Sequence, residues 1–83
     1  MNSTPVIPEA DQSLDVCGLH CPMPLLKAKL ALNAMRAGAV LHVCATDAGS
    51  WDDFAAYITL SPHQMLHREA RTEQFHYWIR KGA

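Results

Sequence analysis

The sequence predicts an α/β fold, specifically an α+β two-layer sandwich with the element order β-α-β-α-β-β. Two observations support this: short alternating segments are separated by two stretches of strong helix formers, and the chain has only 83 residues, 49% of them hydrophobic and 18% charged. Such a chain is enough for one packed domain. Because two helices can cover only one sheet, we expect both on one face of a four-stranded mixed sheet, with the other face meeting solvent.

The structured part is expected to be a single domain over residues 13–83. Residues 1–12 contain Pro5, Pro8 and several polar residues without periodicity, which predicts a flexible N-terminal tail. The net charge of −1 and the pI of about 6.5 argue against direct nucleic-acid binding, which usually needs a basic face. No apolar segment approaches the ~20 residues of a membrane helix. No export signal is visible either, so a cytoplasmic protein is expected.

The first strand and the first helix lie on either side of a glycine. Residues 14–17 alternate and stop at Gly18, which indicates a short strand. Residues 22–36 are strong helix formers. Pro22 and Pro24 fall in the first turn of this helix, where proline costs little because the amides have no intrahelical partner.

One face of this helix is predicted to be buried. The residues at the spacing i, i+3, i+7 and i+10 are Leu25, Ala28, Leu32 and Met35. Leu26 and Leu30 fall about a third of a turn away. They are either the flank of a wide buried face or an exposed contact patch.

The second half of the chain is predicted to contain a strand, a helix and a closing hairpin. The strand spans residues 40–46, with Leu41, Val43 and Ala45 on one face and His42 and Cys44 on the other. Ser50 with Asp53 fits the start of a helix over residues 51–60. Residues 63–70 and 74–80 indicate the hairpin. Its last strand alternates between a set assigned to the core, Phe75, Tyr77 and Ile79, and an opposite set, His76, Trp78 and Arg80.

Cys21 carries the candidate chemistry, because a strand ends, Gly18 turns the chain, and the cysteine stands directly before a helix. The N-terminus of a helix carries positive partial charge and unpaired amides. A thiolate is stabilised there, so the pKa of the Cys21 thiol is expected to fall below that of a free cysteine. Pro22 and Pro24 stiffen the same turn. An exposed and preoriented thiol suits attack on a sulfur or carbon electrophile.

The pattern Leu14-Asp15-x-x-Gly18-Leu19-x-Cys21-Pro22-x-Pro24 resembles the signature of the TusA/SirA/YedF family of small sulfur-carrier (sulfurtransferase) proteins. The resemblance runs on to the C-terminus through Ala45-Thr46-Asp47, Asp53, His63 and Ile79-Arg80-Lys81. It implies the same two-layer fold. It also implies that Cys21 accepts a sulfane sulfur as a persulfide and relays it for tRNA 2-thiouridine formation, cofactor sulfuration or sulfur oxidation. Pro22, Pro24, Gly18 and His20 would support Cys21.

The partners implied by the resemblance are proteins. The sulfur donor would be a cysteine desulfurase or a rhodanese-type protein, and the acceptor would be a second protein. No cofactor, metal or membrane is expected, and the protein is expected to be a monomer. The alternative function is a regulatory or protein-interaction module of the SirA type without sulfur chemistry, for which Leu26, Leu30 and Trp78 would form a docking surface.

The remaining cysteines and histidines leave alternatives open. Cys17 either has no role or is a resolving thiol that attacks a persulfide on Cys21, and we expect it to point away. Cys44 is interpreted as an inert, buried side chain. His20 is either an exposed turn residue or a group that tunes Cys21. A metal site on His42, Cys44 and His76, or redox chemistry between Cys17 and Cys21, would be rival functions, but neither shows the usual spacing.

Overall fold

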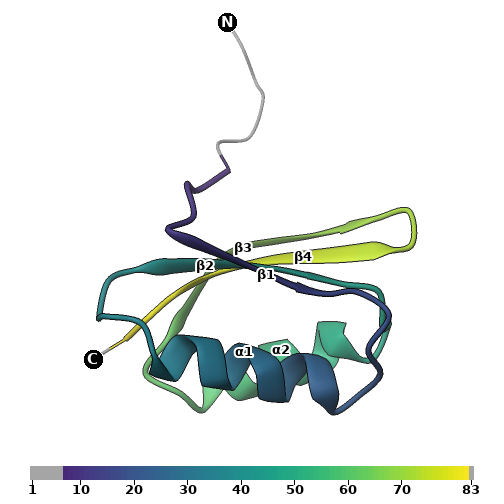
Figure 1. Cartoon of the computed structure of the whole chain (residues 1–83), viewed down its shortest axis with the longest axis horizontal. Coiled ribbons are helices and arrows are strands. Elements are labelled where there is room, and N and C mark those ends of the chain that lie inside the picture. The colour runs from purple at the N-terminus through teal and green to yellow at the C-terminus, as the bar shows by residue number, and fades with distance from the viewer. Residues whose placement is uncertain (1–6, 83) are drawn as a thin grey trace, which may run out of the picture.

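The computed structural model describes residues 7–82 and confirms the predicted fold class. A four-stranded mixed sheet is covered on one face by two helices (Figure 1). The elements follow the predicted order: β1 (Gln12–Val16), α1 (Met23–Asn33), β2 (Val40–Ala45), α2 (Ser50–Thr59), β3 (Gln64–Arg71) and β4 (Gln74–Arg80). Neither helix of the described part has the length and apolar character needed to cross a membrane.

The N-terminal tail predicted over residues 1–12 lies partly outside the described residues. Within them, β1 begins at Gln12, one residue before the expected start of the domain. Asp11 is already attached to the sheet, because its backbone amide donates to the Val40 carbonyl and its carboxylate accepts from the Val40 amide, both at 2.8 Å.

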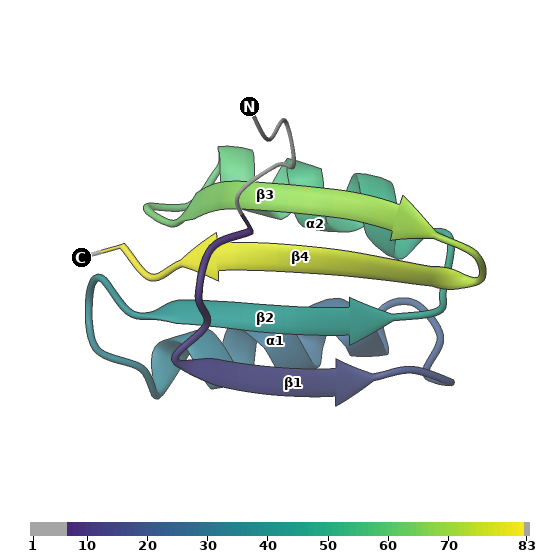
Figure 2. The ribbon, with the colours of Figure 1, turned by 90° about the horizontal axis from the view of Figure 1, so that it is seen from above.

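The strands lie in the order β1-β2-β4-β3 (Figure 2). β1 and β2 are parallel, with Leu14 opposite Val43, and β4 is antiparallel to both β2 and β3. In this view α1 lies behind β1 and β2, and α2 lies behind β3 and β4. The ends of β1 and β2 therefore meet the start of both helices at one edge of the molecule, where the loops that carry Cys21 and Asp47 run.

The core lies between the sheet and the helices, as the alternation of the strands predicts. Its buried members are Val16, Ala28, Leu32, Leu41, Val43, Ala45, Phe54, Ile58, Tyr77 and Ile79. The Phe54 ring stacks on the Tyr77 ring with centroids 4.3 Å apart, which joins α2 to β4. Phe75, also assigned to the core, is only half-buried.

The opposite face of the sheet is less open than expected. His76 and Trp78 expose only 6% and 5% of their surface. His42 stacks on both rings, with centroids 5.1 Å from His76 and 4.6 Å from Trp78, and this stacking excludes water from the middle of the face. The predicted proximity of His42 and His76 is confirmed. Trp78 is too buried to belong to the docking surface proposed from the sequence.

The predicted cap of α2 is wrong. Gly49 occupies the N-cap position without a side-chain cap, and Ser50 is the first helical residue. Ser50 is buried because it faces the core: its hydroxyl donates to the Asp47 carbonyl and pairs with the Tyr77 hydroxyl, both at 2.7 Å. A hydroxyl that is already used by these two partners cannot cap the helix.

α1 ends at Asn33, three residues before the predicted end at Arg36. Leu26 and Leu30 are 43% and 67% exposed, so the second of the two interpretations for these residues, an exposed patch, is correct. They lie outside the stripe that faces the sheet.

The C-terminal end of α1 is completed by a residue from the far end of the domain. The helix has no basic residue in its last turn. Instead, the Lys81 ammonium donates to the Leu32 carbonyl at 2.7 Å. The Lys81 backbone pairs with the Ala39 carbonyl and the Gly38 amide, both at 2.8 Å, and Gly38 has the positive φ (+89°) that this turn requires.

Candidate functional site

The loop after β1 presents Cys21 at the surface. Gly18 turns the chain with a φ of +84°, a conformation that glycine adopts without a steric penalty. The Gly18 amide donates to the Thr46 hydroxyl at 2.8 Å, which ties the loop to the end of β2. Cys21 is exposed, as predicted, and Pro22 is the N-cap of α1. The position of Cys21 is thus fixed by two parallel strands and the start of a helix.

The thiol of Cys21 lies in an acidic environment. Its Sγ donates a hydrogen bond to Asp53 Oδ2 of α2 at 2.9 Å. This hydrogen bond, followed by partial desolvation and the charges of Asp53 and Asp47, raises the pKa of Cys21 above its ordinary value. The expectation that the helix N-terminus lowers this pKa is therefore wrong. The carboxylate that α2 places beside the sulfur outweighs the partial charge of α1.

Asp47 is the second acidic neighbour of Cys21. Its Oδ2 atom is buried and has no hydrogen-bond partner among residues 7–82. A β carbon at Gly49 would lie 3.0 Å from this oxygen and 4.0 Å from Cys21 Cβ, so glycine leaves the space in which the loop and the cysteine approach each other. The side chains around Cys21 leave only a narrow hollow between them, lined by Cys21, Pro22, Pro24, Leu25, Asp47, Ser50 and Asp53.

The supporting residues chosen from the sequence contribute unequally. Pro24 is buried against the core and anchors the first turn of α1, whereas Pro22 is exposed. His20 is exposed, and its backbone carbonyl accepts the Met23 amide at 2.8 Å. The structure thus ties the backbone of His20 to α1. The sequence does not predict that Asp47 and Asp53 are neighbours of Cys21, although both residues lie in the pattern that the family resemblance covers.

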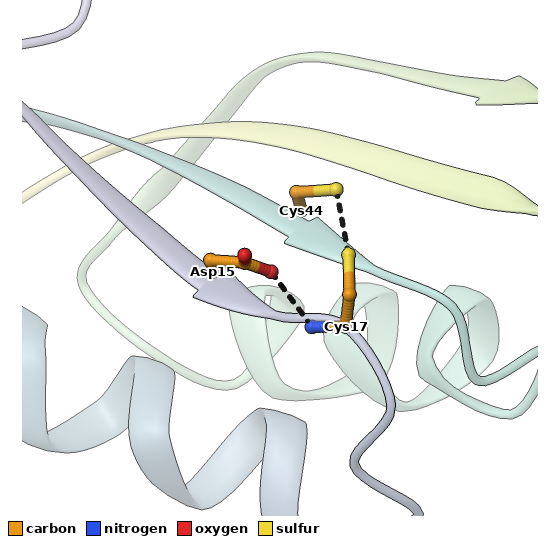
Figure 3. A group of neighbouring side chains, drawn as sticks. All are labelled: Asp15, Cys17 and Cys44. Atoms are coloured by element: carbon orange, nitrogen blue, oxygen red, sulfur yellow. Dashed lines mark hydrogen bonds between the residues drawn. The ribbon is translucent and has the colours of Figure 1, made fainter.

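The Cys17 thiol contacts the Cys44 thiol (Figure 3). The Cys21 thiol contacts Asp53 instead, so Cys17 points away from Cys21, as predicted. The two sulfur atoms are 3.0 Å apart on the face of the sheet that the helices leave uncovered. The contact with Cys44, partial burial and the nearby Asp15 carboxylate raise the pKa of Cys17 to about 12. Cys44 is only half-buried and has a thiol partner, so its description as an inert, buried side chain is incomplete.

Comparison with known proteins gives a consistent result over nearly the whole chain. The family model described as sulfurtransferase TusA matches residues 12–81. A sulfur carrier protein TusA of Allochromatium vinosum is 46% identical over 72 residues, which are 87% of this chain and 95% of that protein. A putative sulfur carrier protein of Bacillus subtilis, YrkI, is 36% identical over 74 residues, which are 89% of this chain and 99% of the relative.

A solved structure has the same fold. The crystal structure of a SirA-like protein from Desulfitobacterium hafniense matches with a TM-score of 0.72 at 25% sequence identity. The match covers 87% of this chain and 99% of that protein.

Proposed function

Because the chain belongs to the TusA family of sulfur carriers, we propose that Cys21 accepts a sulfane sulfur as a persulfide and passes it to an acceptor protein. The observation that carries this proposal is the exposure of Cys21. Of the three cysteines it is the only exposed one, and it stands at the start of α1. Cys17 and Cys44 are half-buried and face each other on the other side of the sheet.

The transfer consists of two displacements at sulfur. In loading, the Cys21 thiolate attacks the terminal sulfur of a persulfide on the donor. The new S–S bond forms while the S–S bond of the donor breaks, and the donor thiolate leaves. In unloading, a nucleophile of the acceptor attacks the terminal sulfur, and the Cys21 thiolate is the leaving group. No electrons are gained or lost overall, so the relay needs no cofactor.

The acidic neighbours give Cys21 two states. At rest, the Cys21 thiol donates a hydrogen bond to the Asp53 carboxylate. This contact keeps the sulfur protonated, which protects it from unintended reactions. A cationic group of a docking partner that pairs with Asp53 would weaken this contact, lower the pKa of Cys21 and favour the thiolate. Once loaded, an anionic persulfide beside Asp53 and Asp47 is repelled, which favours its onward transfer.

The surface around Cys21 suits protein partners. Met23, Leu26 and Leu30 are 41%, 43% and 67% exposed and follow the spacing i, i+3, i+7 along α1, beginning at the Cys21 end. An apolar stripe that starts at the reactive sulfur fits a protein donor, such as a cysteine desulfurase or a rhodanese-type protein, and a protein acceptor. We place the relay in the cytoplasm, with outlets in tRNA thiolation, cofactor sulfuration or sulfur oxidation.

The test is persulfide loading followed by intact-mass measurement. The protein is incubated without oxygen with a cysteine desulfurase and cysteine, or with a rhodanese and thiosulfate. The parent should gain the mass of one sulfur atom, and a reductant should remove it. Cys21→Ser should gain nothing, because it lacks the accepting sulfur.

Matched controls come from the other two cysteines. Cys17→Ala and Cys44→Ser should load as the parent does. Loading of Cys21→Ser, or loss of loading in Cys44→Ser, would contradict the assignment of the carrier residue. If no donor loads the parent, the alternative of a regulatory module that docks through Leu26 and Leu30 gains support, since these side chains are exposed without any role in the fold.

A further inference from the structure

A second group of side chains, each with a potential metal-ligand atom, lies on the sheet face opposite the helices (Figure 3). Asp15 belongs to β1, Cys17 is the first residue after β1, and Cys44 belongs to β2. Asp15 stands opposite Cys44 in the parallel register. Val16, which lies between Asp15 and Cys17, is buried in the core. Because side chains alternate along a strand, Asp15 and Cys17 point to the other face. Three potential metal ligands thus converge from two neighbouring strands.

The distances suit a small cation. The ligand atoms of Asp15, Cys17 and Cys44 lie within 4.8 Å of one another. Two thiolates on a tetrahedral Zn²⁺, with Zn–S bonds of about 2.3 Å, stand about 3.8 Å apart. The sulfur atoms, now 3.0 Å apart, would need to separate by less than about 1 Å. Asp15 is already oriented beside them, because its Oδ1 accepts the Cys17 amide at 2.9 Å.

A histidine of β4 lies next to this group, outside the 4.8 Å that encloses the other three ligand atoms, and would move toward the ion on binding. His76 Nε2 lies 4.0 Å from Cys44 Sγ, and its other ring nitrogen, Nδ1, lies 2.9 Å from His42 Nε2. A hydrogen bond at the second ring nitrogen is typical of metal-binding histidines, because it fixes the tautomer and the orientation of the ring. Gln74 Oε1 lies 3.1 Å from the same Nε2, but Gln74 is exposed and can turn into solvent.

We propose that Asp15, Cys17, Cys44 and His76 bind a thiophilic divalent cation of the zinc type. Two thiolates, one imidazole and one carboxylate make a four-coordinate set that suits Zn²⁺. Binding replaces the two thiol protons, which are released to water, with two Zn–S bonds, and it changes no oxidation state. The ion would join β1, which has only β2 as a neighbour in the sheet, to both central strands. The site is independent of the sulfur relay on Cys21.

The test uses the full chain with Cys21→Ser, reduced and kept free of oxygen, so that the exposed thiol cannot contribute. Co²⁺ serves as the optical probe. We expect one Co²⁺ per chain, with a thiolate charge-transfer band and the visible bands of tetrahedral cobalt, and we expect stoichiometric Zn²⁺ to displace it. Zn²⁺ should also raise the melting temperature, because it binds only the folded state.

Two variants in the same background show whether the proposed ligands are used. Cys17→Ser and Cys44→Ser should each weaken Zn²⁺ binding, measured by competition with a chromophoric chelator, by at least about tenfold. Each should also reduce the thiolate band, and far-UV circular dichroism checks that each variant folds. Two variants are used so that the failure of one to fold leaves the other to decide.

The proposal is overturned by any of three results. The first is the absence of a thiolate band at stoichiometric Co²⁺, and the second is an unchanged band in whichever of Cys17→Ser and Cys44→Ser folds. The third is a Cys17–Cys44 disulfide that forms on exposure to air as fast with stoichiometric Zn²⁺ as without it. None of these results depends on persulfide loading, so the proposed relay can stand or fall separately.

Discussion

The two faces of the sheet hold their cysteines in contrasting surroundings. On the helix side, Cys21 is exposed and its partner is the Asp53 carboxylate. On the other side, Cys17 and Cys44 are half-buried and are partners of each other. The pKa of both Cys21 and Cys17 is raised, but by different first causes, a carboxylate in one case and a thiol in the other.

This contrast indicates that the tertiary partner of a thiol influences its pKa more than its place in a helix or strand does. Cys21 is exposed, so the proposed pairing of Asp53 with a cationic group of a partner protein would change the protonation of Cys21 from outside. On the other face, Cys17 and Cys44 are hydrogen-bonded to each other and present two sulfur atoms side by side. The first arrangement agrees with the proposed sulfur transfer, and the second agrees with the proposed metal site.

The largest expected effect is a difference in alkylation rate between the two sites. Cys17 has a pKa of about 12, whereas a free cysteine has a pKa of about 8.5. Near neutral pH, Cys17 therefore carries roughly a thousandfold less thiolate than a free cysteine does. Cys21 is exposed whereas Cys17 is half-buried, so Cys21 should react with iodoacetamide first. Alkylation of Cys17 should rise about tenfold for each unit of pH until pH approaches 12. Peptide mapping after timed quenching at several pH values measures both rates.

Cys44→Ala sharpens this comparison, because the contact with Cys44 is the first cause of the raised pKa of Cys17. The variant should make Cys17 react roughly a hundredfold faster at a given pH and leave Cys21 unchanged. Equal alkylation rates of Cys17 and Cys21 in the parent protein would contradict the proposed difference in reactivity between the two faces of the sheet.

A smaller effect is expected from Asp53→Asn, which removes the charge but keeps a side chain of similar shape beside Cys21. The pKa of Cys21 should fall, so its alkylation near neutral pH should accelerate by a factor of roughly three to ten. Asp52→Asn is the matched control, since Asp52 is in the same turn of α2 but is not among the causes of the shift. Equal acceleration in both variants would mean that net charge, and not the contact with Asp53, controls the thiol.

The smallest effect concerns the apolar stripe beside Cys21. Leu30→Ser should slow persulfide transfer from a protein donor by a factor of about two to five, since one exposed apolar contact is lost. Alkylation by a small reagent should be unchanged. Leu60→Ser is the control, because Leu60 is 90% exposed at the C-terminal end of α2. A loss of transfer in the control alone would place the docking surface on α2.

The sequence was sufficient for features that depend on local periodicity. The alternation along β2 assigns Leu41 and Val43 to the core and Cys44 to the opposite face, because successive side chains of a strand point to opposite sides. The exposure of Cys21 also followed from its position between a turn and a helix. These predictions need no knowledge of which elements are neighbours.

The contacts that control the chemistry join residues far apart in the sequence. Asp53 is 32 residues from Cys21, and Cys44 is 27 residues from Cys17. The pKa of Cys21 was therefore predicted in the wrong direction, since the local pattern shows the helix N-terminus but not the carboxylate across from it. The cap assigned to Ser50 failed for the same reason, because its competing partner Tyr77 comes from β4.

The attachment of α1 by Lys81 has a consequence for the order in which the domain can form during synthesis. Lys81 follows Leu32 by 49 residues, so the last turn of α1 leaves the ribosome long before the ammonium that completes it. The central strand β2 likewise gains its antiparallel neighbour only after β4 has been synthesised. Until β4 has emerged, β2 has only β1 as a neighbour, and until Lys81 has emerged, the Leu32 carbonyl lacks its ammonium partner. Folding of the domain is thus expected to be completed only once β4 and Lys81 have emerged, with Cys21 emerging first and its acidic neighbours Asp47 and Asp53 later.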